Sequence, residues 1–198
     1  MKPMNLLREI PEEAPKEMKY NINQPGTVYD VATATRYLIR DAKSFNQDII
    51  VVCIGTDRST GDALGPLAGS KLRSINMFQH VYGTLDEPVH ATNLVDKIDE
   101  IKAKSPHSFL IAVDACLGKL ENVGCVSLGK GSIKPGAAVK KELPSVGDAY
   151  ITGVVNVGGF MEHLVLQSTR LSLVMKMADT IAYGLSFALY AGQKNSTQ

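Results

Sequence analysis

The chain has few of the features that mark secreted or membrane proteins. It contains only three cysteines among 198 residues, and Cys53, Cys116 and Cys125 form no C-x-x-C pair. An odd number of cysteines without paired spacing favours a reducing, cytoplasmic compartment over a disulfide framework. No apolar stretch approaches the roughly 18 residues of a membrane span, and the N-terminus lacks the apolar core of a signal peptide. We therefore expect no membrane partner.

An excess of charge of one sign is missing as well. The 21 Lys and Arg residues nearly balance the 20 Asp and Glu residues, which gives a net charge of +1. A chain so close to neutrality has no general attraction for nucleic acid, so nucleic acid is not an expected partner. The four histidines form neither H-x-x-x-H nor H-E-x-x-H, and no preformed zinc site or other cofactor is predicted.

The most informative feature is the segment from Asp48 to Leu72, which reads DIIVVCIGTDRSTGDALGPLAGSKL. Its first part, Ile49 to Ile54, is almost unbroken apolar sequence, which is typical of a strand buried on both faces of a parallel sheet. Apolar residues at helical spacing follow the polar loop of residues 55–62. That loop therefore leaves the carboxyl end of the sheet, where open α/β folds place their ligand sites.

The rest of the chain alternates between strand-like and helix-like segments. This alternation predicts an α/β fold, a three-layer α/β/α sandwich with a mostly parallel central sheet. Helices are predicted at 27–44, from the loop to about 72, and at 92–104, 159–169 and 178–191. Strands are predicted at 48–54, 81–85, 108–113, 125–128 and 171–177, and 129–136 as a loop. Residues 149–155 fit either a strand or a loop because glycines surround them.

The domain boundaries follow from composition. Residues 1–26 are rich in Pro, Glu, Lys and Asn, and we expect an extended or partly disordered N-terminal arm. Residues 27–192 form a single α/β domain, and 193–198 form a polar tail. The sequence leaves the oligomeric state open, because the closing helix carries Tyr183, Phe187 and Tyr190, which suit either a homo-oligomer interface or burial against the sheet.

Two aspartates stand where predicted strands end. Asp62 lies at the start of the helix after the loop, and Asp114 follows the apolar run FLIAV. Taken singly, Asp62 fits a first-turn acid stabilised by the helix dipole by roughly 0.3–1 kcal/mol, and Asp114 fits a turn cap. Parallel strands bring both acids to one sheet edge, where a carboxyl pair either shares a proton or holds a cation. We therefore predict Asp62 and Asp114 as the catalytic pair.

The polar loop supplies the first candidates for substrate binding. It lacks the G-K-[ST] ending of a P-loop and the G-x-G-x-x-G pattern, and Asp57 and Asp62 would repel phosphate, so nucleotide binding is disfavoured. Arg58 suits either a substrate carboxylate or an ion pair within the loop. The residues predicted to shape the cleft and bind substrate main chain are Thr56, Asp57, Arg58 and Ser59.

Three residues outside the loop are further candidates. His90 precedes a helix at a strand exit and is the histidine expected near the cleft, with surface or capping as the plainer role. Asn156 lies in TGVVNVGGF, where its amide suits either a peptide main chain or a helix cap. Cys116 borders the same edge, but a thiol nucleophile needs an adjacent base, and a structural cysteine is the favoured interpretation.

The segments IGTDRSTGDALGPLAGSKL, VDACLG and TGVVNVGGFMEHLVLQSTRLSLVMKMADTIAYGL closely resemble the YyaC-type sporulation proteins of endospore-forming bacteria. The resemblance runs over about residues 27–192. More distantly, the motif is similar to the spore germination protease and to the hydrogenase maturation endopeptidases. These relatives imply a phosphorylase/hydrolase-like fold.

The resemblance also implies site residues. In the germination protease, the acid of the run D-A-L-G-P matches Asp62, and the second acid corresponds to Asp114. Maturation endopeptidases add a later histidine, and these three residues bind the nickel of the precursor. Here the segment after Pro144 has no histidine where that ligand is expected, and Asn156 is the nearest polar equivalent. This departure favours a metal-free acid pair.

With the acid pair, the resemblance implies a sporulation-associated endopeptidase in the cytoplasm of the sporulating cell or the spore interior. One carboxylate would activate water while the other, protonated, donates to the peptide group. The expected partner is a protein or peptide substrate such as a spore protein. Two alternatives stay open: a non-catalytic spore assembly or binding protein on a protease scaffold, and a metal-dependent protease or amidase that uses Asp62, Asp114 and His90.

Overall fold

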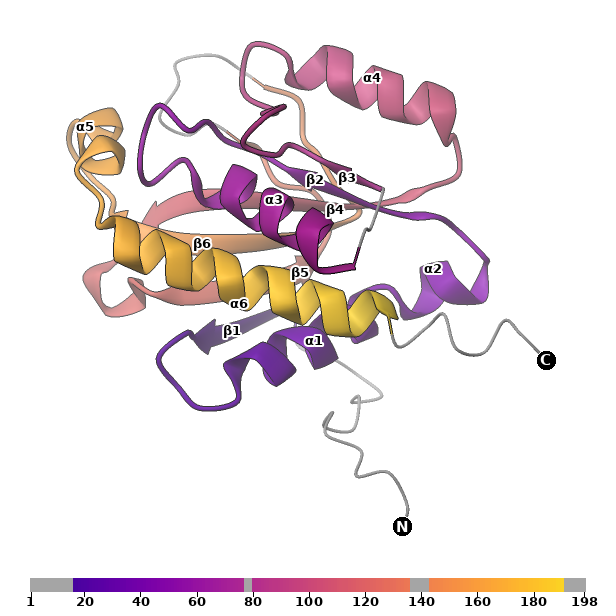
Figure 1. The fold of residues 1–198 in the computed structure, drawn as a ribbon, viewed down its shortest axis with the longest axis horizontal. Coiled ribbons are helices and arrows are strands. Elements are labelled where there is room, and N and C mark those ends of the chain that lie inside the picture. The colour runs from indigo at the N-terminus through magenta and orange to yellow at the C-terminus, as the bar shows by residue number, and fades with distance from the viewer. Residues whose placement is uncertain (1–15, 77–79, 136–142, 191–198) are drawn as a thin grey trace.

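The structure, a computed structural model, describes residues 16–76, 80–135 and 143–190 (Figure 1). Six strands form one sheet in the order β1-β5-β6-β4-β2-β3. The strands are β1 (Glu17–Asn21), β2 (Ile49–Cys53), β3 (Val81–Tyr82), β4 (Phe109–Gly118), β5 (Cys125–Lys130) and β6 (Ala149–Val157). The helices are α1 (Thr27–Leu38), α2 (Arg40–Ser44), α3 (Leu64–Asn76), α4 (Leu94–Lys104), the short η1 (Leu120–Asn122), α5 (Glu162–Gln167) and α6 (Leu171–Tyr190).

The centre of the sheet is parallel, as the sequence predicts. Strands β6, β4, β2 and β3 pair in parallel, while β5 pairs antiparallel with β6 on one side and with β1 on the other. The parallel register sets Val113 of β4 opposite Cys53, the last residue of β2. The carboxyl ends of β2 and β4 therefore reach the same edge of the sheet.

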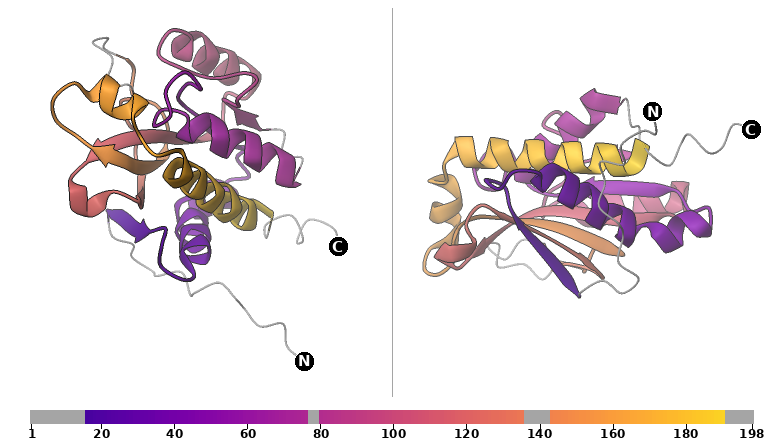
Figure 2. Two further views of the ribbon diagram at one scale, coloured as in Figure 1. Left: turned by 60° about the vertical axis from the view of Figure 1, so that its left-hand side comes forward. Right: turned by 90° about the horizontal axis from the view of Figure 1, so that it is seen from below.

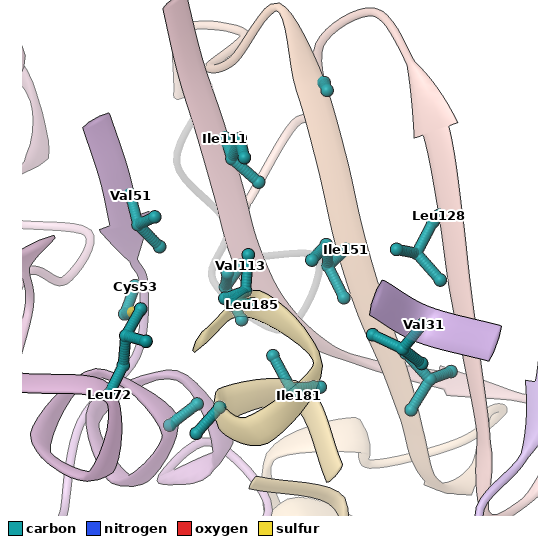
Figure 3. Packing of buried hydrophobic residues seen from close by; sticks show 14 of the residues in the cluster. Val31, Val51, Cys53, Leu72, Ile111, Val113, Leu128, Ile151, Ile181 and Leu185 are labelled. Atoms are coloured by element: carbon teal, nitrogen blue, oxygen red, sulfur yellow. The ribbon is translucent and has the colours of Figure 1, made fainter. Parts of the chain in front are cut away.

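Helices cover both faces of the sheet, which confirms the predicted three-layer α/β/α architecture. On one face α6 lies between α1 and α3, and the two views of Figure 2 show these helices on the same side of the sheet. On the other face α4 packs through Leu94, Ile98 and Ile101. Figure 3 shows the larger core, where Ile181 and Leu185 of α6 lie against the face of the sheet that carries Val113 and Ile151.

The burial of β2 explains its unbroken apolar sequence. All five of its residues are buried. Val51 and Cys53 point into the core beneath α3 and α6, whereas Ile50 and Val52 point into the core beneath α4. A strand that packs on both faces has no position for a polar side chain, so its polar residues are confined to the loop that follows.

Three predictions at the level of elements are wrong. Residues 17–21, assigned to the arm, form the edge strand β1, because β5 offers them a free side for main-chain pairing. Residues 27–44 form two helices, with a break at Ile39. Residues 171–177 are not a strand but the first turns of α6. Their apolar residues follow a helical period, since Val174, Met177 and Ala178 are buried while Leu171 and Met175 are exposed.

The remaining boundaries differ by a few residues. Residues 149–157 are a strand, and β5 continues to Lys130, into the predicted loop of residues 129–136. The helix predicted at 159–169 covers only Glu162–Gln167. Most of the predicted arm and the polar tail (residues 1–15 and 193–198) lie outside the described residues. None of the helices in the described ranges combines the length and the apolarity that a membrane-spanning segment requires.

Candidate functional site

The site begins where β2 and β4 part. The N–H of Ile54 donates to the carbonyl of Val113 at 2.7 Å, the last hydrogen bond between the two strands in the described residues. Beyond it β2 turns toward Val89, whose carbonyl accepts the N–H of Gly55 at 2.8 Å. Strand β4 continues beside β6 as far as Gly118. An opening therefore forms beside the last residues of β4, at the carboxyl edge of the sheet.

The loop of residues 55–62 folds back onto this opening. The N–H of Thr56 donates to the carbonyl of Asp62 at 3.2 Å, so the two ends of the loop touch. This closure needs glycine at position 55, whose φ of 141° is rare for other residues and whose Cβ would collide with that same carbonyl. Gly65 likewise lets α3 approach the carbonyl of Ile54 closely. Both contacts hold Asp62 at the end of β2.

A cavity of about 440 Å³ fills the opening, a size within the range of about 300–1,000 Å³ that is usual for ligand sites. Three structural units form much of its wall, and Ile54, the segment of His90, residues 133–135, Leu143 and Thr152 line other parts of it. The end of β4 contributes Asp114, Ala115, Cys116 and Leu117. The loop of residues 55–62 contributes Gly55, Ser59 and Asp62, and α5 contributes Glu162, His163, Leu166 and Gln167. Both predicted catalytic acids therefore line one cavity.

Asp114 is the more deeply buried acid, with 7% of its surface exposed. It is not the residue after a strand, as predicted, but a residue within β4 at the point where β2 ends. One carboxyl oxygen accepts the N–H of Ala115 at 2.8 Å. Burial, and second the charge of Asp62, raise the pKa of Asp114 well above the usual value of 3.8, and the Ala115 N–H opposes this only in part.

Asp62 is partly buried, and its pKa is also raised above 3.8. Burial is the largest cause, while the Thr56 backbone N–H and the charge of His90 act in the opposite direction. Asp62 therefore has two neighbours that stabilise its ionised form, whereas Asp114 is destabilised as an anion by Asp62 itself. This asymmetry makes Asp114 the group that holds a proton and Asp62 the group that ionises first.

Two predicted substrate-binding residues reach the cavity with the acids. His90 lines it, and its ring Nδ1 lies 2.9 Å from Thr92 Oγ1. Ser59 lines it as well, and its buried Oγ has no hydrogen-bond partner among the described residues. A buried hydroxyl without a partner is free to bond a ligand. Ser59 is therefore the loop residue best placed to bind substrate.

The other loop candidates do not line the cavity. Asp57 and Arg58 are exposed, and the Thr56 hydroxyl accepts the N–H of Arg58 at 3.3 Å, a contact that shapes the turn. The structure thus gives Thr56 a role in the loop and leaves Asp57 and Arg58 on its outer side. The predicted cleft residues separate into one inward-facing serine and three residues of the turn.

Asn156 also lies outside the cavity wall. Its amide donates to the carbonyl of Val165 at 3.3 Å and to Thr169 Oγ1 at 3.2 Å, and its Oδ1 accepts the N–H of Val157 at 2.9 Å. These bonds tie the segment that carries α5 to the end of β6. Asn156 therefore holds α5 over the cavity, and its own side chain is not part of the cavity lining.

Sequence reasoning missed the contribution of α5. Glu162 and His163 line the cavity, although no spacing or motif in the sequence joins them to the two aspartates. Among the described residues, no three His, Cys, Asp or Glu side chains are arranged to hold a metal ion. Cys116 lines the cavity as well, but burial raises its thiol pKa to about 11, so the thiol is protonated at neutral pH. The carboxyl pair is the chemistry that the geometry offers.

Comparison with known proteins places the chain in a family. Residues 21–184 match the model of the family described as "Protein of unknown function (DUF1256)". The chain belongs to the DUF1256 family. It is 58% identical over 145 residues to YyaC of Bacillus subtilis (strain 168), a match that covers 73% of this chain and 71% of YyaC. The resemblance of this DUF1256 chain to YyaC-type proteins is thereby confirmed.

A solved structure is similar at a much lower level. The [NiFe] hydrogenase maturation protease HycI from Thermococcus kodakarensis KOD1 is 18% identical, with a TM-score of 0.47, over 73% of this chain and 93% of HycI. A likeness this distant transfers neither site nor activity. The chemistry of the DUF1256 chain has to be argued from its own residues.

Proposed function

We propose that this protein is an endopeptidase of sporulating cells that hydrolyses peptide bonds with Asp62 and Asp114. One observation carries the proposal: the two carboxyl groups line the same cavity, burial raises both pKa values, and the charge of Asp62 raises that of Asp114 further. Such a pair offers an ionised base and a protonated acid at the same pH, which amide hydrolysis requires. The resemblance to YyaC-type sporulation proteins supplies the cellular setting.

The hydrolysis begins with Asp62. Its carboxylate takes a proton from a water molecule, and the hydroxide adds to the carbonyl carbon of the substrate. Asp114, which is protonated, donates its proton to the carbonyl oxygen as that oxygen gains charge. When the tetrahedral species collapses, the C–N bond breaks, the amine leaves with the proton from Asp62, and Asp114 recovers its own. The net reaction consumes one water and yields one carboxylic acid and one amine.

Two neighbours support this division of roles. The charge of His90 lowers the pKa of Asp62 and so favours the carboxylate that the base requires. The unpartnered Oγ of Ser59 offers a hydrogen bond to the substrate main chain. Both residues line the cavity with the acids, and neither takes part in the proton transfers that accompany cleavage of the C–N bond.

Cleavage of natural proteins tests the proposal. Protein extract from Bacillus subtilis spores is incubated with the wild-type protein, with Asp62→Asn, with Asp114→Asn and with Asp86→Asn, and new peptide termini are mapped by mass spectrometry. Asp86 is an exposed acid away from the cavity and serves as the matched control. We expect defined new termini with the wild type and Asp86→Asn and none with the two site variants.

The same experiment separates the alternatives. Identical termini from all four folded proteins would reject the acid pair. A complete lack of termini, even when samples span the whole of sporulation and germination, would favour a non-catalytic binding protein. Termini that depend on added metal would favour the metal-dependent alternative.

A further inference from the structure

The cavity contains an exposed strand edge. Strand β2 pairs with β4 only as far as Cys53 and Val113, yet β4 continues to Gly118 with β6 on its other side. Among the described residues, no strand therefore lies beside residues 115–118 on the side of β4 that β2 has left. Ala115, Cys116 and Leu117 all line the cavity, so this free edge faces the space beside the two acids.

The main-chain groups that face this edge follow from the alternation of the strand. The N–H of Phe109 and the carbonyl of Val113 bond to the β2 side, to Asp48 and Ile54 respectively. Even-numbered residues face the other way: Leu110 exchanges hydrogen bonds with Asp148, and the carbonyl of Gly118 accepts the N–H of Gly158. Neighbouring residues of a strand direct their main-chain groups to opposite sides. Ala115 and Leu117 therefore direct theirs toward the free edge.

Three of these four groups are available to a ligand. The N–H of Ala115 is already bonded to the Asp114 carboxyl at 2.8 Å. The carbonyl of Ala115 and both main-chain groups of Leu117 make no hydrogen bond in the described parts of the chain. The register shift that follows Cys116 falls on β6, which carries the extra residue Val155, so β4 stays regular through the edge. The edge thus presents two acceptors and one donor at strand spacing.

We propose that an extended peptide docks on this edge as an added strand, in the line that β2 occupies further back in the sheet. Its main chain would pair with Ala115 and Leu117, which places the adjacent peptide bonds beside Asp114 and Asp62. This inference rests on the proposed peptidase function and names its substrate class: unfolded tails or loops able to extend, recognised mainly through their main chain. Strand addition of this kind gives affinity through the backbone and leaves side-chain choice to the surrounding pockets.

The structure supplies a matched pair of variants. Leu117→Pro removes the one free N–H of the edge, and it leaves the pairing with β6 intact because that N–H points away from β6. Leu117→Ala removes the same leucine side chain but keeps the N–H. The difference between the two variants therefore reports on the main-chain hydrogen bond. Circular dichroism and thermal melting establish that both variants are folded.

A binding experiment that needs no cleavage tests the proposal. Immobilised Asp114→Asn protein is exposed to synthetic octapeptides randomised at every position, and a retained peptide is resynthesised with a single backbone N-methyl group at each position in turn. We expect the Kd, measured by fluorescence anisotropy, to rise at least tenfold for N-methylation at alternate positions and less than threefold between them. The unmethylated peptide should bind the double variant Asp114→Asn, Leu117→Pro at least tenfold more weakly than Asp114→Asn, Leu117→Ala.

Each outcome has one meaning. Retention of no peptide, or N-methyl effects without the period of two, would overturn the docking site. Equal affinity of the proline and alanine variants would overturn the role of the Leu117 N–H. A period of two together with an absence of cleavage by the wild type would keep the docking site and reject the proposed hydrolysis.

Discussion

Ile54 donates its N–H to the carbonyl of Val113 at 2.7 Å, and the next residue on each strand belongs to the site. After Ile54 comes Gly55, where the loop that carries Asp62 begins, and after Val113 comes Asp114. The parting of two parallel strands thus creates both the cavity and the acid pair. A strand end that opens in this way is the usual place for ligands in α/β folds.

Cleavage should depend on pH in a bell shape. Asp62 must be ionised and Asp114 protonated, and both pKa values lie above 3.8. Activity rises with pH as Asp62 loses its proton and falls as Asp114 loses its own, so both limbs of the pH profile lie on the alkaline side of pH 3.8.

Replacing either acid with Asn should lower kcat by about 10²–10⁴-fold. Steady-state rates between pH 4 and 9 measure this, and a rate independent of pH across the range would contradict the assigned roles.

Asp114→Asn should stabilise the folded protein at neutral pH. In the folded state the Asp114 pKa is raised, so the carboxylate is disfavoured there relative to the unfolded chain. Below pH 3.8 the group is protonated in both states and contributes no difference; the wild type then loses stability as the pH rises through the folded pKa. The unfolding free energy of Asp114→Asn should therefore exceed that of the wild type by a margin that grows from pH 4 to pH 8. Each kcal/mol of this difference raises Tm by about 2–4 °C.

Differential scanning fluorimetry at both pH values checks the stability prediction. The exposed acid Asp86 provides the control, because Asp86→Asn removes the same charge from a solvated position. Equal changes in Tm for the two variants at pH 8 would show that Asp114 is not destabilised by its site.

Asn156→Ala should release α5 from the end of β6. The variant loses the hydrogen bonds to the Val165 carbonyl and the Thr169 hydroxyl, at about 1–2 kcal/mol of unfolding free energy in total. Since Glu162, His163 and Leu166 of α5 line the cavity, we also expect a larger rise in KM than fall in kcat. Hydrogen exchange of residues 158–170 should accelerate, while the exposed-site variant Asn23→Ala should leave it unchanged.

Cys116 should be dispensable. Burial raises its thiol pKa to about 11, and the Thr152 hydrogen bond opposes this only in part, so very little thiolate exists at pH 7. Cleavage by Cys116→Ala should remain within about threefold of the wild type, and alkylation by iodoacetamide should be slow until the pH approaches 11. A loss of activity as large as that of Asp114→Asn would instead make the thiol a nucleophile.

The sequence predicted the fold and the acid pair because both depend on local patterns. Continuous apolarity marked β2 and β4 as central strands, and the position of Asp62 and Asp114 at their ends placed both acids at one edge. Strand β4 runs past its predicted end because Asp114 interrupts the apolar run, and the four residues that follow are too few to predict a strand on their own. The free strand edge therefore had no signal in the sequence.

Other parts of the site depend on tertiary contacts that no spacing encodes. Which loop residue faces inward is set by the closure between Gly55 and Asp62, which turns Ser59 in and leaves Arg58 out. The arrival of α5 over the cavity depends on the bonds that Asn156 makes after the chain has folded. The assignment of residues 171–177 to a strand failed because a short apolar run does not distinguish a buried strand from a helix that is buried on one side.

An NMR titration of the Asp114 carboxyl measures the electrostatic coupling between the two acids directly. Carbon-13 in the aspartate side chains reports its protonation in the wild-type protein and in Asp62→Asn. This coupling predicts a pKa of Asp114 above 3.8 in the wild type and a lower value in Asp62→Asn, because burial remains while the repelling charge is gone. An ordinary pKa of Asp114, or the same raised pKa in both proteins, would contradict it.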